Sequence, residues 1–181
     1  PVQHFLIQTA ILERLQGSLC EAVIGEPNEP GSGQVMLERL EKANLFLTPL
    51  DDERQWYRYH QLFAEALHHY LHRMRPAQVQ ILHQRASIWY EQHGLLHEAV
   101  RHALKATDFE RAAHLMEQVG NSLVSQGEIA TLQHWMAALP NEVVRSHVEI
   151  SIWQGWLLFV SGNYDAAERH LEAIEHRFDI N

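Results

Sequence analysis

The chain has 181 residues, 46% of them hydrophobic, which suffices for one large domain or two small ones around a buried core. Its 14 Lys and Arg residues against 23 Asp and Glu residues give a formal net charge of −9. Phosphate binding requires clustered basic residues, so we expect no direct contact with nucleic acid. The longest apolar runs are shorter than the roughly 20 residues of a membrane helix, and no basic-then-apolar leader opens the chain, so we expect no membrane partner and a cytoplasmic location.

Two further features concern compartment and completeness. The single cysteine, Cys20, cannot form a disulfide within the chain, which fits a reducing compartment. The chain begins at Pro1 without an initiator Met and stops at Asn181 directly after a strongly helical segment. We therefore expect it to be an internal part of a longer protein.

Three helical segments are predicted at the start of the chain. Residues 2–15 have apolar side chains at roughly helical spacing. Residues 18–25 follow, with Ser18 and Glu21 in the S-x-x-E arrangement of a capping box, which satisfies free amides at a helix start. After a polar Gly/Pro loop over residues 25–33, a third helix is predicted from an apolar face made of Met36, Leu37, Leu40 and Ala43.

A β-hairpin is predicted after the third helix. The segments "LFLTPL" (45–50) and "QWYRYH" (55–60) are rich in aromatic or branched residues, and they flank the polar residues "DDER". Pro49 favours an edge strand, because proline cannot donate to a neighbouring strand. The order of three helices, a two-stranded wing and a further helix predicts a winged-helix-like domain over residues 1–75.

Residues 76–181 predict helices only, with turns that recur. Gly94, Gly127 and Gly162 are 33 and 35 residues apart, on either side of the period of about 34 residues of tetratricopeptide-type helix pairs. Gly94 and Gly162 each have a small residue, Ala99 or Ala167, five positions later. A capping box at Thr107–Glu110 marks another helix start. We therefore predict a mainly α protein in which a helical arm and the start of a tetratricopeptide-like α-solenoid follow the winged helix.

The repeats are irregular in the middle of this region. The copy at Gly127 has Leu132 where the small residue is expected, and Pro140 interrupts the unit after it. A solenoid of this type presents surfaces for ligands or proteins rather than a catalytic cleft.

The sequence has 14 histidines, and two of them have the spacing of metal ligands. His68 and His72 lie at i and i+4 in the helix after the wing, but no third ligand is evident. The run "HEAVRH" from His97 to His102 is one residue too long for the H-E-x-x-H zinc pattern. The helix that contains His68 and His72 also has an apolar stripe on its other side, made of Phe63, Ala66, Leu67, Tyr70, Leu71 and Met74. We therefore expect His68 and His72 on a solvated face and no metal site.

Catalysis is not expected within these residues. The chain contains no G-x-x-x-x-G-K-[ST] phosphate loop and no G-x-S-x-G nucleophile elbow, and no spacing singles out a Ser-His-Asp triad.

His60 is the candidate site residue. In an alternating strand, Trp56, Arg58 and His60 project to one side, and His60 then precedes the free amides at the start of the next helix. Its imidazole could bind a phosphate supplied by a neighbouring domain, or it could cap the helix or pack against the wing.

Four segments together resemble a known family. "FLIQTAILERLQGSLCEAV", "MLERLEKANLFLTPLDDERQWYRYHQLFAEAL", "HQRASIWYEQHGLLHEAVRHALKATDFERAAHLME" and "LQHWMAALPNEV" resemble the middle portion of the large ATP-dependent LuxR-type transcriptional regulators, the MalT-like signal-transduction ATPases with numerous domains. The resemblance covers nearly the whole chain. It implies a nucleotide-binding domain upstream and a helix-turn-helix DNA-binding domain downstream.

The resemblance also implies a role for His60. "YRYHQLF" is similar to the Met-His-Asp motif of related switches, whose histidine contacts the β-phosphate of bound ADP. Only His60 matches, since Tyr59 stands in place of the Met and Gln61 in place of the Asp. The cofactor implied is ATP or ADP, held in the parent protein and not in this segment alone.

The mechanism implied is a shift between two populations. ADP bridging the upstream nucleotide-binding domain and the winged helix would favour a closed monomer, while ATP and an unknown inducer or protein on the helical repeats would favour an open, self-associating form. The alternative is a stand-alone helical-repeat adaptor for protein partners. A serine/threonine kinase with the same regulatory middle region is a variant of the first interpretation.

Overall fold

The computed structural model describes residues 2–25 and 31–177. By packing, the chain divides into two compact units, residues 1–106 and residues 107–181. Most of the loop predicted over residues 25–33 lies outside the described residues. Among the residues described, no helix has both the length and the apolar character needed to cross a membrane.

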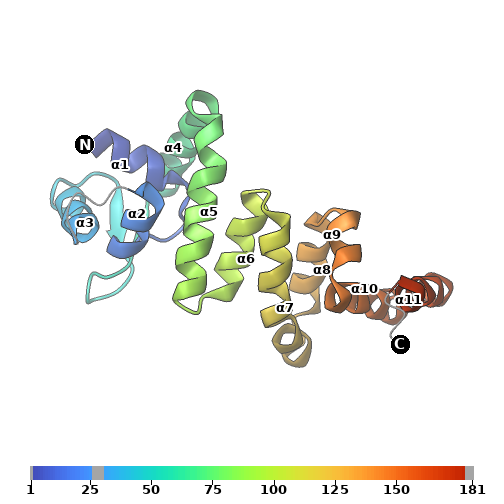
Figure 1. Ribbon diagram of the computed structural model, residues 1–181. Coiled ribbons are helices and arrows are strands. Elements are labelled where there is room, and N and C mark those ends of the chain that lie inside the picture. The colour runs from blue at the N-terminus through green and yellow to red at the C-terminus, as the bar shows by residue number, and fades with distance from the viewer. Residues whose placement is uncertain (1, 26–30, 178–181) are drawn as a thin grey trace. The chain divides into compact units, whose positions relative to one another are not determined.

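The first unit contains a winged helix and a pair of longer helices (Figure 1). Its elements are α1 (Val2–Gln8), the 3-10 helix η1 (Thr9–Ile11), α2 (Gly17–Ile24), α3 (Ser32–Lys42), β1 (Leu47–Pro49), β2 (Tyr57–Tyr59), α4 (Gln61–Met74), α5 (Pro76–Gln92) and α6 (Leu96–Lys105).

The predicted first helix over residues 2–15 is too long. α1 ends at Gln8, and the chain then passes through η1 into extended backbone. Leu15 forms an antiparallel bridge with Tyr57, in which each residue donates its N–H to the other's carbonyl at 2.7 and 2.8 Å. The apolar residues after Gln8 therefore reach the core partly through strand pairing, a pattern that helical spacing alone cannot distinguish.

The predicted hairpin is present as β1 and β2, which pair antiparallel with Leu47 opposite Tyr59 and Pro49 opposite Tyr57. Because β2 also bridges Leu15, β1 is the edge strand among the described residues, as Pro49 predicts. The Asp51 carboxylate accepts hydrogen bonds from the backbone N–H groups of Gln55 and Trp56 and so fixes the hairpin loop.

The predicted capping box at Ser18 is wrong. α2 begins at Gly17 with Gln16 as its N-cap. The Ser18 hydroxyl bonds the Gln16 side chain, while the Glu21 carboxylate accepts the N–H of Gly33 at 2.7 Å. Glu21 therefore joins α2 to the start of α3 instead of closing its own helix.

Arg85 attaches α5 to the winged helix. Its guanidinium donates to the carbonyls of Val23 and Ile24 at 3.1 and 2.8 Å, at the C-terminal end of α2. A positive charge at this end complements the helix dipole. α5 and α6 then form an antiparallel pair (Figure 1). The predicted division of the chain at residue 75 stays a prediction; by packing, α5 and α6 belong to the same compact unit as the winged helix.

The second unit consists of helices in the described residues (Figure 1). They are α7 (Phe109–Gln126), α8 (Ile129–Ala138), α9 (Asn141–Ser146), α10 (Val148–Val160) and α11 (Tyr164–Arg177). α7 packs on α8, α9 and α10, and α10 packs on α11. α7 begins at Phe109 with Asp108 as its N-cap, whose side chain accepts the N–H of Arg111. The predicted cap at Thr107 is therefore displaced by one residue.

The three recurring glycines lie at helix turns as predicted. Gly94, Gly127 and Gly162 have positive φ values of 71°, 76° and 79°, which suit glycine. The helices α6, α8 and α11 begin two residues after them. Ala99 and Ala167, the small residues of the pattern, are buried. Helix pairs thus follow one another, and their classification as tetratricopeptide-like stays a prediction.

Candidate functional site

His60 lies at the junction between β2 and α4. Its backbone N–H donates to the carbonyl of Phe46 at 2.8 Å, and its own carbonyl accepts the N–H of Ala64 at 2.9 Å, which is the first bond of α4. The strand pairing of Tyr57–Tyr59 and the helix start at Gln61 leave His60 as the one residue between the two elements. Its backbone is therefore fixed from both sides.

The His60 imidazole is exposed and lies beside the wing. Its Nε2 is 3.3 Å from the Thr48 hydroxyl of β1, and the ring meets the edge of Phe46 with centroids 6.5 Å apart. Within the described residues, the His60 side chain makes no capping hydrogen bond to α4, so the capping alternative is wrong. The wing contact is present, and the ring remains accessible to an external ligand.

Phe46 has an unusual backbone beside His60. Its φ is 51°, a left-handed value that is uncommon for a bulky residue. Its ring stacks on Phe63 with centroids 5.0 Å apart. A cleft of about 760 Å³ lies next to it, lined by Asn44, Phe46, His60, Gln61, Leu62, Phe63 and Ala66.

The predicted apolar stripe of α4 is largely uncovered in this chain. Leu71 is buried, but Tyr70 is 42% exposed and Met74 is 58% exposed. Much of the stripe lines a second, almost wholly apolar cleft of about 610 Å³, together with residues of α1 and the segment before β1: Val2, Gln3, Leu6, Ile7, Leu45, Phe46, Phe63, Ala66, Leu67 and Tyr70. The stripe that sequence periodicity assigns to the core is therefore an accessible surface.

His68 and His72 are exposed, as predicted, and bond each other through their Nε2 atoms at 3.0 Å. They line a cavity of about 550 Å³ together with Lys105. Partial burial, and then the positive charges of His72 and Lys105, lower the pKa of His68.

The run "HEAVRH" lies in α6, and its second histidine is buried. His102 and His83 of α5 are hydrogen-bonded Nδ1 to Nδ1 at 2.8 Å, and the ring of Tyr90 stacks on His102. Burial lowers the pKa of His83 to about 3 and that of His102 to about 2, with the nearby charge of Lys105 adding to both effects. Two neutral imidazoles satisfy this bond, one as donor and one as acceptor.

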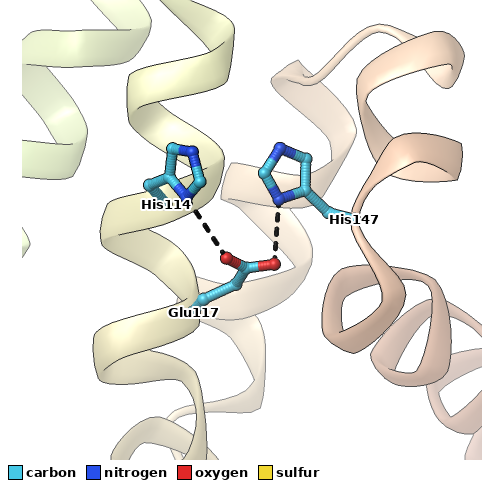
Figure 2. Close-up of side chains that lie close together, drawn as sticks. All are labelled: His114, Glu117 and His147. Carbon is cyan, nitrogen blue, oxygen red and sulfur yellow. Dashed lines mark hydrogen bonds and ion pairs between the residues drawn. The ribbon is translucent and has the colours of Figure 1, made fainter.

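A cluster of His and Glu residues in the second unit was not predicted. His114 and Glu117 lie on α7, and His147 is the N-cap of α10, so that the side chains converge from two segments (Figure 2). The Glu117 carboxylate lies 2.8 Å from Nδ1 of His147 and 3.5 Å from Nδ1 of His114. One donor atom from each of the three residues lies within 4.8 Å of the other two.

Glu110 completes the surroundings of His147. Its carboxylate lies 3.1 Å from Nε2 of His147, on the side of the ring away from Glu117. Burial by itself would lower the pKa of His147, but the hydrogen bonds and charges of Glu117 and Glu110 outweigh it and raise the pKa. The ring is thus held by a carboxylate at each nitrogen.

Sequence spacing contains only part of the signal for this cluster. His114 and Glu117 have the i, i+3 spacing of neighbours on one helix face. His147 is 30 residues further along and approaches through the packing of α9 and α10 on α7.

The comparisons with known proteins agree with the winged-helix architecture. Residues 1–79 match the family described as the MalT winged helix domain. Over 155 residues, which are 86% of this chain, the sequence is 39% identical to the serine/threonine-protein kinase PknK of Mycobacterium tuberculosis, and the match covers 14% of that protein.

A second relative is the HTH-type transcriptional regulator MalT of Vibrio parahaemolyticus, 30% identical over 173 residues, which are 96% of this chain and 19% of that protein. The MalT protein of Vibrio campbellii is 29% identical over the same length. The chain therefore spans less than a fifth of the length of these relatives. Residues 1–79 form a MalT winged helix domain, and the chain is homologous to MalT transcriptional regulators and to PknK.

Proposed function

We propose that this chain is a non-catalytic switch and sensor segment of an ATP-dependent LuxR-type transcriptional regulator. In this role it couples the nucleotide state of an upstream ATPase domain to the binding of an inducer or protein partner on the helices after residue 76. The observation that carries the proposal is the exposed imidazole of His60, fixed between β2 and α4 beside an open cleft.

The junction suits a phosphate brought by another domain. His60 offers a ring nitrogen that can donate a hydrogen bond, and α4 begins directly after it, so that the positive end of the helix dipole faces the same region. A phosphate of ADP held by the upstream domain would receive both contributions. The nucleotide therefore belongs to the parent protein, and His60 acts as a contact from outside the nucleotide-binding domain.

The apolar cleft along α4 supports the upstream domain as a partner. An exposed apolar surface of this size on a regulatory segment favours contact with another protein surface. In the closed state the upstream domain would cover it, with ADP bridging the two domains. In the open state, favoured by ATP and the inducer, the parent would self-associate, provided that the inducer binds the open form more tightly than the closed one.

The test is to measure the ADP affinity of the full-length protein and to compare the unsubstituted protein with His60→Ala. We expect a loss of about tenfold or more, equivalent to about 1.4 kcal/mol, the range of one charge-assisted hydrogen bond. His69→Ala, another exposed histidine on α4, is the matched control and should leave the affinity unchanged. Residues 1–181 alone provide the baseline, with negligible nucleotide binding. An unchanged affinity in a folded His60→Ala protein would reduce His60 to a wing contact.

The similarity to PknK supports a second version of the proposal. In this version the same segment regulates a serine/threonine kinase domain instead of a DNA-binding domain. The domains encoded on either side of this segment separate the two versions: a downstream basic helix-turn-helix supports the first, and a kinase domain supports the second.

A further inference from the structure

The cluster of His114, Glu117 and His147 has the donor types of a transition-metal site. Imidazole nitrogen and carboxylate oxygen together suit zinc and its neighbours in the first transition row, whereas magnesium and calcium favour oxygen donors alone. The three residues come from two segments of the second unit that lie far apart in the sequence, which is typical of a site assembled by folding. Figure 2 shows both imidazoles turned toward the Glu117 carboxylate.

The donor atoms are somewhat further apart than a tetrahedral zinc ion requires. Zinc bonds of about 2.0–2.2 Å place neighbouring donor atoms about 3.3 Å apart. Nδ1 of His147 lies 2.8 Å from one Glu117 oxygen, and Nδ1 of His114 lies 3.5 Å from the other. One donor atom from each of the three residues lies within 4.8 Å of the other two. His114 is exposed, so its side chain can adjust to close the remaining gap.

Glu110 stands where metal sites commonly have a supporting carboxylate. A histidine that binds metal through one ring nitrogen usually donates the N–H of the other to a carboxylate or carbonyl, which fixes the ring's tautomer and orientation. His147 has this arrangement, with Nδ1 toward the cluster and Nε2 at 3.1 Å from Glu110. Glu117 and Glu110 together also offset the two positive charges of a divalent cation.

We propose that His114, Glu117 and His147 bind a zinc-type divalent cation, with Glu110 orienting His147 and a fourth position open to water. The ion would join α7 to the start of α10. Because such a site forms only when both segments are folded together, binding would stabilise the second unit by mass action.

The first experiment is calorimetric titration of residues 1–181 with zinc chloride. We expect one equivalent bound with micromolar or tighter affinity, and a loss of tenfold or more in His114→Ala. His114 is exposed, so its removal should leave the helices intact, which circular dichroism verifies. His134→Ala removes another exposed histidine of the second unit and should bind as the parent does. Equal affinity for the parent and His114→Ala, or binding only in the millimolar range, would overturn the proposal.

Two further variants locate the ion. Glu110→Gln should weaken zinc binding by about 10- to 100-fold, the usual effect of losing a supporting carboxylate, while the three ligands remain. The double variant His68→Gln/His72→Gln removes the exposed pair on α4 and should bind zinc normally. Loss of binding in that double variant, with normal binding in Glu110→Gln, would place the ion on α4 and refute the assignment.

Discussion

Buried histidines in the two compact units have opposite electrostatic preferences. In the first unit His83 and His102 are each 3% exposed, and their pKa values are lowered. In the second unit His147 is 9% exposed, and its pKa is raised. His147 is less completely buried than the pair in the first unit, and its preferred charge is the opposite.

Burial and the neighbouring groups together explain the difference. Burial and the nearby positive charge of Lys105 disfavour a proton on His83 and His102, and no carboxylate is among the causes that set their pKa values. His147 has the Glu117 and Glu110 carboxylates at its two nitrogens, which compensate for the cost of burying a charge. The comparison shows that carboxylates at the two ring nitrogens can outweigh the effect of burial, whereas burial lowers the pKa where such carboxylates are missing.

The largest expected effect is a loss of stability of the first unit in acid. Unfolded histidines titrate near 6.5, so between about pH 3 and 6.5 the unfolded state binds more protons than His83 and His102 do in the folded state. Their contribution is therefore complete above pH 6.5 and decreases as the pH falls. From pH 6.5 to 4.5 the loss should be about 4 kcal/mol for the two groups.

Amide hydrogen exchange in α5 and α6, corrected for the intrinsic pH dependence, measures this loss. The control is the double variant His83→Leu/His102→Leu, which replaces both partners together and leaves neither one buried without a partner. Its stability should depend much less on pH over the same range. If the parent and the double variant have equal slopes, the acid sensitivity belongs to other groups and the comparison fails.

A smaller effect is expected for Glu117→Gln in the second unit. The neutral amide removes the charge beside Nδ1 of His147, so the pKa of His147 should fall toward its ordinary value. A raised pKa stabilises the folded state below about pH 6.5, and this stabilisation disappears as the pH rises through the folded pKa. The variant should therefore lose about 1–2 kcal/mol at pH 6 and less at higher pH.

Titration of the histidine ring protons by NMR, with a chelator present to exclude metal, follows His147 directly, and urea unfolding gives the stability. His134 is exposed on the same unit and serves as the internal reference. A His147 titration that is identical in the parent and Glu117→Gln would contradict the view that the carboxylates set its charge.

The smallest effect is expected for the exposed pair on α4. His72→Gln should change the free energy of unfolding by no more than about 0.5 kcal/mol, because the site is solvated. It should nevertheless raise the pKa of His68, since it removes a positive charge beside that ring. The same NMR titration measures this rise, and a fall in the pKa of His68 would contradict it.

Local sequence patterns predicted much of the fold, because they reflect local constraints. The three glycines at helix turns, the hairpin and the edge position of Pro49 follow from backbone conformation and hydrogen bonding within a few residues. The errors have the same origin. Ser18 and Glu21 match a capping box, but the helix already begins at Gly17, and Glu21 instead bonds Gly33 of the next helix.

The candidate sites depended more on tertiary structure. The position of His60 between strand and helix was predictable, since both neighbours have strong local signals. The apolar stripe of α4 was predicted, but its exposure was not, because periodicity identifies a face without identifying what covers it. The cluster at His147 was missed, because His147 meets Glu117 only when the helices of the second unit pack.

The left-handed backbone of Phe46 has a consequence for the junction at His60. A bulky residue with a φ of 51° holds elastic energy of about 1–3 kcal/mol, which the stacking on Phe63 and the hydrogen bond from His60 keep in place. The strained backbone at Phe46 is therefore held by two contacts, the ring stacking and the hydrogen bond. One of these contacts comes from the backbone of His60. A ligand that displaced His60 would therefore let Phe46 relax and would release this strain energy.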